Sequence, residues 1–169
     1  MSRMDEKRLR RRRPRRGGRA AFALWMAGAT LGCATGPPTA SLTVDPVVDG
    51  TALVVQGTSD LPDGTILLYE VRHERLEHDP ETPIQMLLVE GSMTVDQGVF
   101  EAVVDLSNFE PGDVDVWVAL EMQLRGGATQ PRQTVRRFGS DGARMEGGNV
   151  VDLGEDGKRI EVIVRVDRG

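Results

Sequence analysis

The stretch from Gly112 to Leu124 reads GDVDVWVALEMQL, and its alternation decides the fold class. One set of alternate positions is apolar and comprises Val114, Val116, Val118, Leu120, Met122 and Leu124. The other set is mostly polar and comprises Asp113, Asp115, Trp117, Ala119, Glu121 and Gln123. A helix would scatter both sets around its axis, whereas a β-strand places them on opposite faces. The stretch therefore predicts a half-buried strand.

The same two-residue period recurs in other segments of the chain. These segments are residues 41–45, 51–57, 65–73, 84–95, 100–106 and 160–167. Turn signals such as Pro111-Gly112 separate them, because Pro presets φ for a turn and Gly accepts positive φ. About seven strands at this spacing predict an antiparallel immunoglobulin-like β-sandwich. Residues 134–138 are the exception and predict one helical turn.

The charge of the chain is divided unevenly between its two parts. Residues 1–32 contain ten basic and two acidic residues, which leaves 11 basic and 24 acidic residues for the remainder, a net charge of −13. Residues 8–19 are arginine-rich and residues 20–32 are uncharged and mostly apolar. Thirteen helical residues cover about 20 Å, short of the roughly 30 Å hydrocarbon core of a bilayer. This order predicts a signal peptide over residues 1–32.

The predicted signal peptide ends at the only cysteine of the chain. Thr30-Leu31-Gly32-Cys33 resembles the bacterial lipobox, in which the cysteine is acylated and becomes the mature N-terminus. The resemblance implies lipidation at Cys33, a tether over residues 33–40 and a folded domain over residues 41–169. The alternative is cleavage after Ala29, which would release a periplasmic or secreted soluble protein with a free thiol.

A second resemblance lies in the turn between two predicted strands. Residues 57–65 read GTSDLPDGT and resemble a GTTxLPDGT motif of uncharacterised secreted bacterial proteins with an immunoglobulin-like β-sandwich. Further similarity follows in order at residues 98–100, 111–112, 130–131 and 139. The resemblance implies an exported immunoglobulin-like domain and assigns no activity.

The segment HERLEH, residues 73–78, looks at first like a zinc-protease signature. His73 and His78 are five residues apart, whereas a zinc-binding helix needs histidines four apart on one face. We therefore predict a charged loop over residues 73–83, with no metal and no cofactor. The chain also lacks a Gly-x-Ser-x-Gly nucleophile motif, and residues 152–157 read as a turn rather than a calcium loop. These observations favour a protein that is not an enzyme.

Trp117 is the most informative candidate for ligand binding. Alternation places it on the polar face together with Asp115 and Glu121, and such a tryptophan suits stacking on a sugar or anchoring a protein partner. The alternative is that the loop 126–149, with Phe138, folds over the indole and makes a small second core.

We therefore expect an exported cell-envelope lipoprotein, attached to the membrane by its lipid, that serves as a non-enzymatic binding or structural module. Its expected partner is an envelope protein or a glycan. Nucleic acid is disfavoured because the domain is acidic. Two alternatives stay open. One is an inhibitor or regulator of a secreted enzyme, acting through the loop 73–83 or 126–149, and the other is a hydrolase whose site the sequence does not reveal.

Overall fold

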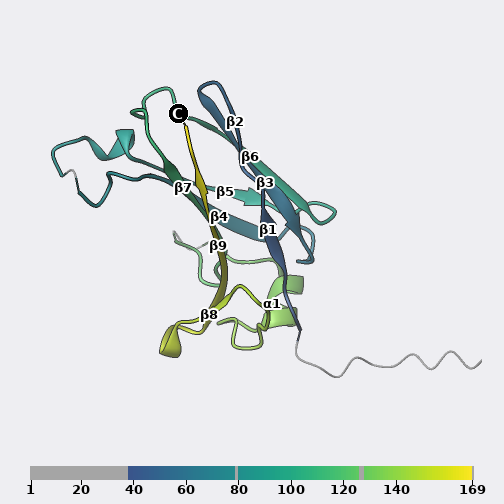
Figure 1. Cartoon of the computed structure of the whole chain (residues 1–169). Helices are drawn as coiled ribbons and strands as arrows, with labels where there is room; N and C mark the ends of the chain where they lie inside the picture. The colour runs from purple at the N-terminus through teal and green to yellow at the C-terminus, as the bar shows by residue number, and fades with distance from the viewer. Residues whose placement is uncertain (1–37, 79, 126–127, 169) are drawn as a thin grey trace, which may run out of the picture. The chain divides into compact units, whose positions relative to one another are not determined.

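The computed structural model describes residues 38–78, 80–125 and 128–168. Within these residues the chain is mostly β-structure, 47% strand and 11% helix, in nine strands that form two antiparallel sheets (Figure 1). The predicted signal peptide, Cys33 and the first part of the predicted tether lie outside the described residues. None of the described helices is long and apolar enough to cross a membrane.

One sheet contains four strands, with β3 at its centre. Its strands are β1 (Leu42–Val44), β2 (Val47–Asp49), β3 (Ala52–Ser59) and β6 (Val99–Asp105). The short strands β1 and β2 pair with the two ends of β3, and β6 pairs along nearly its whole length. Because a strand has two edges, β1 and β2 share one edge of β3 and β6 takes the other.

The second sheet contains five strands in the order β5-β4-β7-β9-β8. Its strands are β4 (Ile66–His73), β5 (Leu88–Thr94), β7 (Val114–Leu120), β8 (Val150–Asp152) and β9 (Lys158–Val166). Strands β1, β3 and β6 in one sheet and β4, β7 and β9 in the other follow the immunoglobulin-like order. The predicted all-β sandwich is confirmed, and the stretch that predicted it forms the central strand of the larger sheet.

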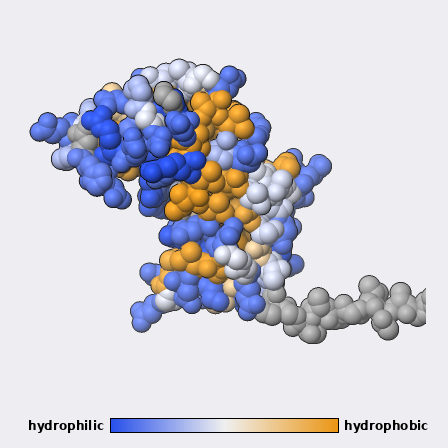
Figure 2. Space-filling view, in the orientation of Figure 1, coloured by the Kyte–Doolittle hydropathy of each residue, from blue (hydrophilic) through white to orange (hydrophobic). Residues whose placement is uncertain are grey.

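The core lies between the two sheets, where their inward side chains meet. From β7 the inward residues are Val114, Val116, Val118 and Leu120, all fully buried, as the alternation predicts. Phe100 and Val104 of β6 face them from the other sheet and are each 3% exposed. In Figure 2, apolar residues gather over the middle of the visible face, between charged residues.

The elements that differ from prediction are short. Strands β2 and β8 have three residues each and both read Val-Val-Asp, which shows no alternation of apolar and polar residues. The strand predicted over residues 84–95 starts at Leu88, because a 3₁₀ turn, η1 (Ile84–Met86), follows Pro83. A second 3₁₀ turn, η3 (Gly154–Asp156), follows β8.

The predicted helical turn is a helix of seven residues, α1 (Arg132–Phe138). It begins after Pro131 and ends at Gly139, whose φ of 92° favours glycine. Figure 1 places α1 at the end of the sandwich where β1 begins. There the residues before β1 already belong to the fold: Ala40 N donates to Glu146 O at 2.8 Å, and Arg137 donates to Thr39 O at 2.6 Å.

The GTSDLPDGT turn joins β3 to β4 and connects several elements. At Gly57 a Cβ would lie 2.0 Å from Thr43 O, so only glycine fits. The buried Thr65 hydroxyl lies 2.7 Å from that of Thr134 in α1, and the Gln130 side chain bonds both backbone groups of Ile66. The resembling residues at 57–65 and 130–131 therefore meet in one place and stabilise the fold.

His73 does not belong to the loop that the sequence predicted for residues 73–83. It is the last residue of β4, it is 2% exposed, and its Nδ1 accepts a hydrogen bond from Arg75 N at 3.1 Å. His78 lies in the exposed turn that follows. The charged loop thus begins at Glu74, and the first histidine is a core residue because the two-residue period of β4 turns it inward.

Candidate functional site

The outer face of the five-stranded sheet is hollowed by a groove of about 570 Å³. Its floor and walls come from outward residues of β4, β5, β7 and β9, and Leu124, Arg125 and Ala128 border it. The outer face of an antiparallel sheet is commonly solvated and polar. A hollow that contains a buried aromatic residue therefore distinguishes this face.

Trp117 lines the groove and is only 7% exposed. The guanidinium carbons of Arg72 and Arg159 lie 6.0 Å and 5.6 Å from the centroid of its ring, within the range of cation–π contact. Register places Arg72 beside Asp115 on one side of Trp117, and Arg159 lies on the other side. The indole is therefore held between two cations along the strand.

Glu161 fixes the indole from the neighbouring strand. Trp117 Nε1 donates to Glu161 Oε2 at 2.8 Å, so the polar edge of the ring is satisfied. Arg159 Nε lies 2.8 Å from the same oxygen and forms an ion pair with it, although the angle gives this buried nitrogen no hydrogen bond. One carboxylate oxygen thus serves both groups that enclose the groove floor.

The charges that line the groove are nearly balanced. Its carboxylates are Glu70, Glu90, Glu121 and Glu161, and its guanidiniums are Arg72, Arg125 and Arg159. Arg72 pairs with Glu70, Arg159 pairs with both Glu121 and Glu161, and Arg125 pairs with Glu90. The lining carries one more negative charge than positive charge.

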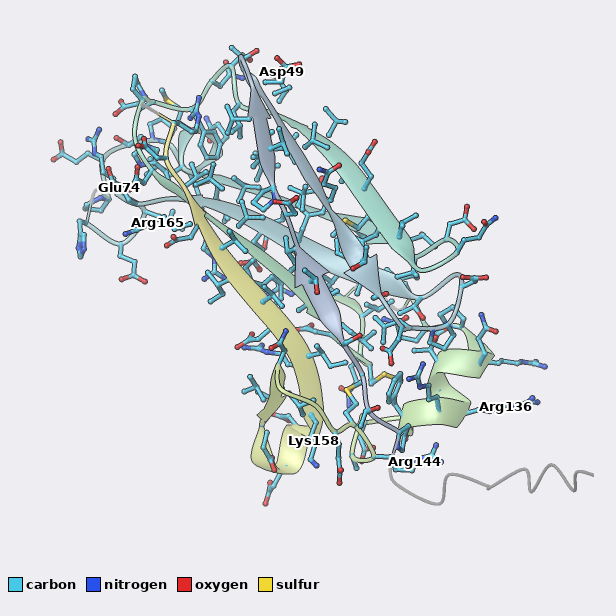
Figure 3. All side chains as sticks on the ribbon, turned by 45° about the vertical axis from the view of Figure 1, so that its right-hand side comes forward. Asp49, Glu74, Arg136, Arg144, Lys158 and Arg165 are labelled. Atoms are coloured by element: carbon cyan, nitrogen blue, oxygen red, sulfur yellow. The ribbon has the colours of Figure 1, made fainter. Side chains whose placement is uncertain are left out.

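The structure brings together two of the three residues that the sequence proposed for ligand binding. Trp117 and Glu121 both line the groove. Asp115 shares their face but lies outside the groove lining, where Arg165 Nε binds its Oδ1 at 3.0 Å. Figure 3 shows Arg165 projecting from the end of β9 near Glu74, far from Lys158 at the other end. The fourth predicted site residue, Cys33, lies outside the described residues.

Phe138 does not cover Trp117, contrary to the alternative interpretation of the loop 126–149. Phe138 is fully buried in the main core between the sheets, and Trp117 is not part of that core. The indole instead lies within cation–π range of two guanidiniums and donates a hydrogen bond to Glu161, and Ala128 of the predicted loop borders the groove. Arg72, Glu70 and Glu90 were missed, because their outward position is visible in the sequence but their neighbours across the sheet are not.

Chemistry elsewhere in the described residues is sparse. No group of three or more His, Cys, Asp or Glu side chains in the part of the chain that the structure describes is placed to hold a metal ion. The pKa of Asp105, on β6 of the other sheet, is lowered by hydrogen bonds from the backbone and side chain of Ser107. This carboxylate lies away from the groove.

Comparison with known proteins assigns no family. No family model and no curated protein matches the chain. Two similar solved structures are wild-type OgpA from Akkermansia muciniphila and its catalytically inactive form in complex with an O-glycopeptide (glycodrosocin) substrate. They are 17% and 16% identical, with TM-scores of 0.34 and 0.33 over 52% and 57% of this chain. The matches span 25% and 28% of those chains, and similarity this low leaves the function to be argued from this chain's own residues.

Proposed function

We propose that this chain is an exported, lipid-anchored binding module without enzymatic activity, whose ligand site is the groove over β4, β5, β7 and β9. The observation that carries the proposal is the groove itself: a hollow of about 570 Å³ lies on the outer face of the five-stranded sheet, over a tryptophan that donates a hydrogen bond to Glu161 and lies between two guanidiniums. Its size is within the range of small-ligand sites, about 300 to 1,000 Å³.

Support for binding rather than catalysis comes from the way the polar groups are used. Each carboxylate of the groove lies in an ion pair with an arginine, which suits orientation of a ligand. Both nitrogens of the buried His73 already face backbone groups, Arg75 N and Pro111 O, so this imidazole has no role as a base for a groove ligand.

The anchor is supported by sequence and by the start of the fold. Cys33 directly follows a predicted signal peptide, and the first described contacts of the domain are those of Pro38 and Thr39. The few intervening residues span at most about 3.6 Å each, which would keep the domain close to the membrane surface.

The test is crosslinking in living cells followed by mass spectrometry of the envelope fraction. We expect an acylated Cys33 and one recurrent crosslinked partner, an envelope protein or a glycan. The variant Ser92→Trp, which fills the groove from its exposed rim, should lose that adduct. The matched variant Val99→Trp, on the outer face of the other sheet, should retain it.

An unmodified Cys33 would contradict the anchor, and an adduct that survives Ser92→Trp would contradict the groove as the ligand site. The two parts of the proposal therefore fail separately.

A further inference from the structure

Two carboxylates of the groove face each other across neighbouring strands. Glu70 on β4 and Glu90 on β5 occupy directly opposite positions in the antiparallel ladder, and both line the groove. Like charges at opposite positions destabilise a sheet, whereas opposite charges stabilise it. The pair is therefore unfavourable for folding by itself.

The type of pairing also brings the two glutamate side chains close together. His73 N donates to Leu87 O at 2.8 Å, so His73 and Leu87 form a hydrogen-bonded pair. Along β4 and β5, hydrogen-bonded and non-hydrogen-bonded pairs then alternate. Glu70 and Glu90 consequently form a non-hydrogen-bonded pair, the type in which Cα atoms are about 4.5 Å apart and side chains are closest. A cation between these carboxylates would relieve their repulsion.

The chain neutralises the two carboxylates unequally. Arg72 Nε donates to Glu70 Oε2 at 2.8 Å, and only 14% of the Glu70 side chain is exposed. Arg125 lies 3.5 Å from Glu90, with 82% of its own side chain and 50% of that of Glu90 exposed. Exposed pairs of this kind contribute about 0 to 1 kcal/mol, so an external cation can replace Arg125 at little cost.

The strand that carries Glu90 is also an open edge. Strand β5 pairs with β4 on one side, and no strand of the described residues pairs with its other side. Because the odd-numbered residues of β5 direct their backbone groups to β4, Leu88, Glu90 and Ser92 direct theirs to the free edge. The side chains of these same even-numbered residues lie on the outer face of the sheet.

An added antiparallel strand would therefore hydrogen-bond to Glu90 and place the residue opposite it on the groove side. We propose that the groove recognises a partner protein that adds an extended strand to the free edge of β5. A Lys or Arg of that strand enters between Glu70 and Glu90 in place of Arg125. This inference rests on the proposed binding role of the groove and names its ligand.

Charge complementarity favours this occupant over others. The chain from residue 33 onward carries a net charge of −13, and the groove lining without Arg125 carries two excess negative charges. A basic partner is attracted over long range by this negative charge, and once bound it forms ion pairs with the Glu70 and Glu90 carboxylates. An anionic ligand would have to break the ion pairs of Arg72 and Arg159.

The test is selection of a heptapeptide phage library against the mature protein. Peptides with a Lys or Arg among alternating β-branched residues should be enriched. Binding of a selected synthetic peptide should weaken roughly tenfold in Glu90→Gln, the loss expected for one charge-assisted contact. It should also weaken in Ser92→Pro, which removes an N–H from the free edge and leaves the bonds to β4 in place.

The other free edge supplies matched controls. Strand β6 also pairs on one side, and it presents an exposed Glu101 and Val103. The variants Glu101→Gln and Val103→Pro should leave peptide binding unchanged. Peptides without a basic residue, or binding that survives both Glu90→Gln and Ser92→Pro, would overturn the inference. A glycan crosslinked through the groove would also overturn it while leaving the binding role intact.

Discussion

The outer faces of the two sheets share one backbone pattern and differ in what covers them. On the five-stranded sheet the outward Trp117 is 7% exposed and the outward Ala119 is fully buried. On the four-stranded sheet Val47, Val99 and Val103 are 44%, 54% and 65% exposed. Val47, Val54 and Val103 form a row across that sheet.

Alternation assigns a residue to one face of a sheet, but it does not determine what surrounds the residue there. Both faces come from strands with the same two-residue period. On the five-stranded face, arginine and glutamate side chains form ion pairs around the indole, and the Gln130 side chain donates to Glu121 O at 2.7 Å. The four-stranded face exposes three valines beside Glu101, and its valine side chains are too short to cover their neighbours.

The largest expected effect is on the floor of the groove. Replacing Trp117 by alanine should destabilise the protein by about 3 to 5 kcal/mol, because a buried aromatic side chain is removed and a cavity is left. Replacing Val103 by alanine should change stability by less than about 0.5 kcal/mol. Urea unfolding of both variants measures the contrast. Equal effects would mean that the two faces do not differ in packing.

The second effect concerns the carboxylate that holds the indole. The variant Glu161→Leu removes the acceptor of Trp117 Nε1 and the ion partner of Arg159 Nε. An unsatisfied buried donor costs about 1 to 3 kcal/mol, so thermal unfolding should shift by a corresponding amount. Glu101→Leu on the other outer face is the control and should stay close to wild type. An unchanged unfolding temperature in Glu161→Leu would show that the carboxylate does not stabilise the indole.

The third effect has the opposite sign. Glu90→Gln should stabilise the protein by about 0.2 to 1 kcal/mol at low ionic strength, because it removes a like charge opposite Glu70. Added salt should reduce the gain by screening the repulsion. Unfolding at two salt concentrations measures both, with Glu101→Gln as the reference. Loss of stability in Glu90→Gln would show that the pair with Arg125 outweighs the repulsion.

The smallest effect belongs to Asp105 on the four-stranded sheet. Its lowered pKa reflects hydrogen bonds from Ser107, so its contribution to stability is present above the ordinary value of 3.8 and is lost as the pH falls through the lowered value. The variant Ser107→Ala removes the side-chain bond and should raise the pKa toward the ordinary value. An NMR titration of the Asp105 carboxyl follows the change, and an unchanged midpoint would contradict the assigned cause.

Most of the fold was predictable because its long strands expose a two-residue period. The ladder of β7 predicted both its inward valines and the outward position of Trp117. The short strands β2 and β8 were not predictable, since both read Val-Val-Asp and show no alternation, whereas the equally short β1 reads Leu-Thr-Val and was predicted. The burial of His73 was not predicted, because charged residues follow it directly. The position of His73 nevertheless continues the alternation of β4.

The site was only partly predictable for a different reason. Trp117 and Glu121 were found because they lie on one strand, where spacing alone places them on a common face. Glu70, Glu90 and Arg159 come from three other strands, and only the register of the sheet brings them to the same groove. The pairing of Glu70 with Glu90 depends on a single offset between β4 and β5, which the sequence does not specify.

The proposed partner should contact the groove face and not the face that exposes Val47, Val99 and Val103. The most direct test places a photoreactive amino acid at Ser92 on the groove rim and, separately, at Val103 on the opposite face, in the full-length chain in living cells. We expect one recurrent adduct from position 92 and none from position 103. The same adduct from position 103, or none from position 92, would contradict the proposal.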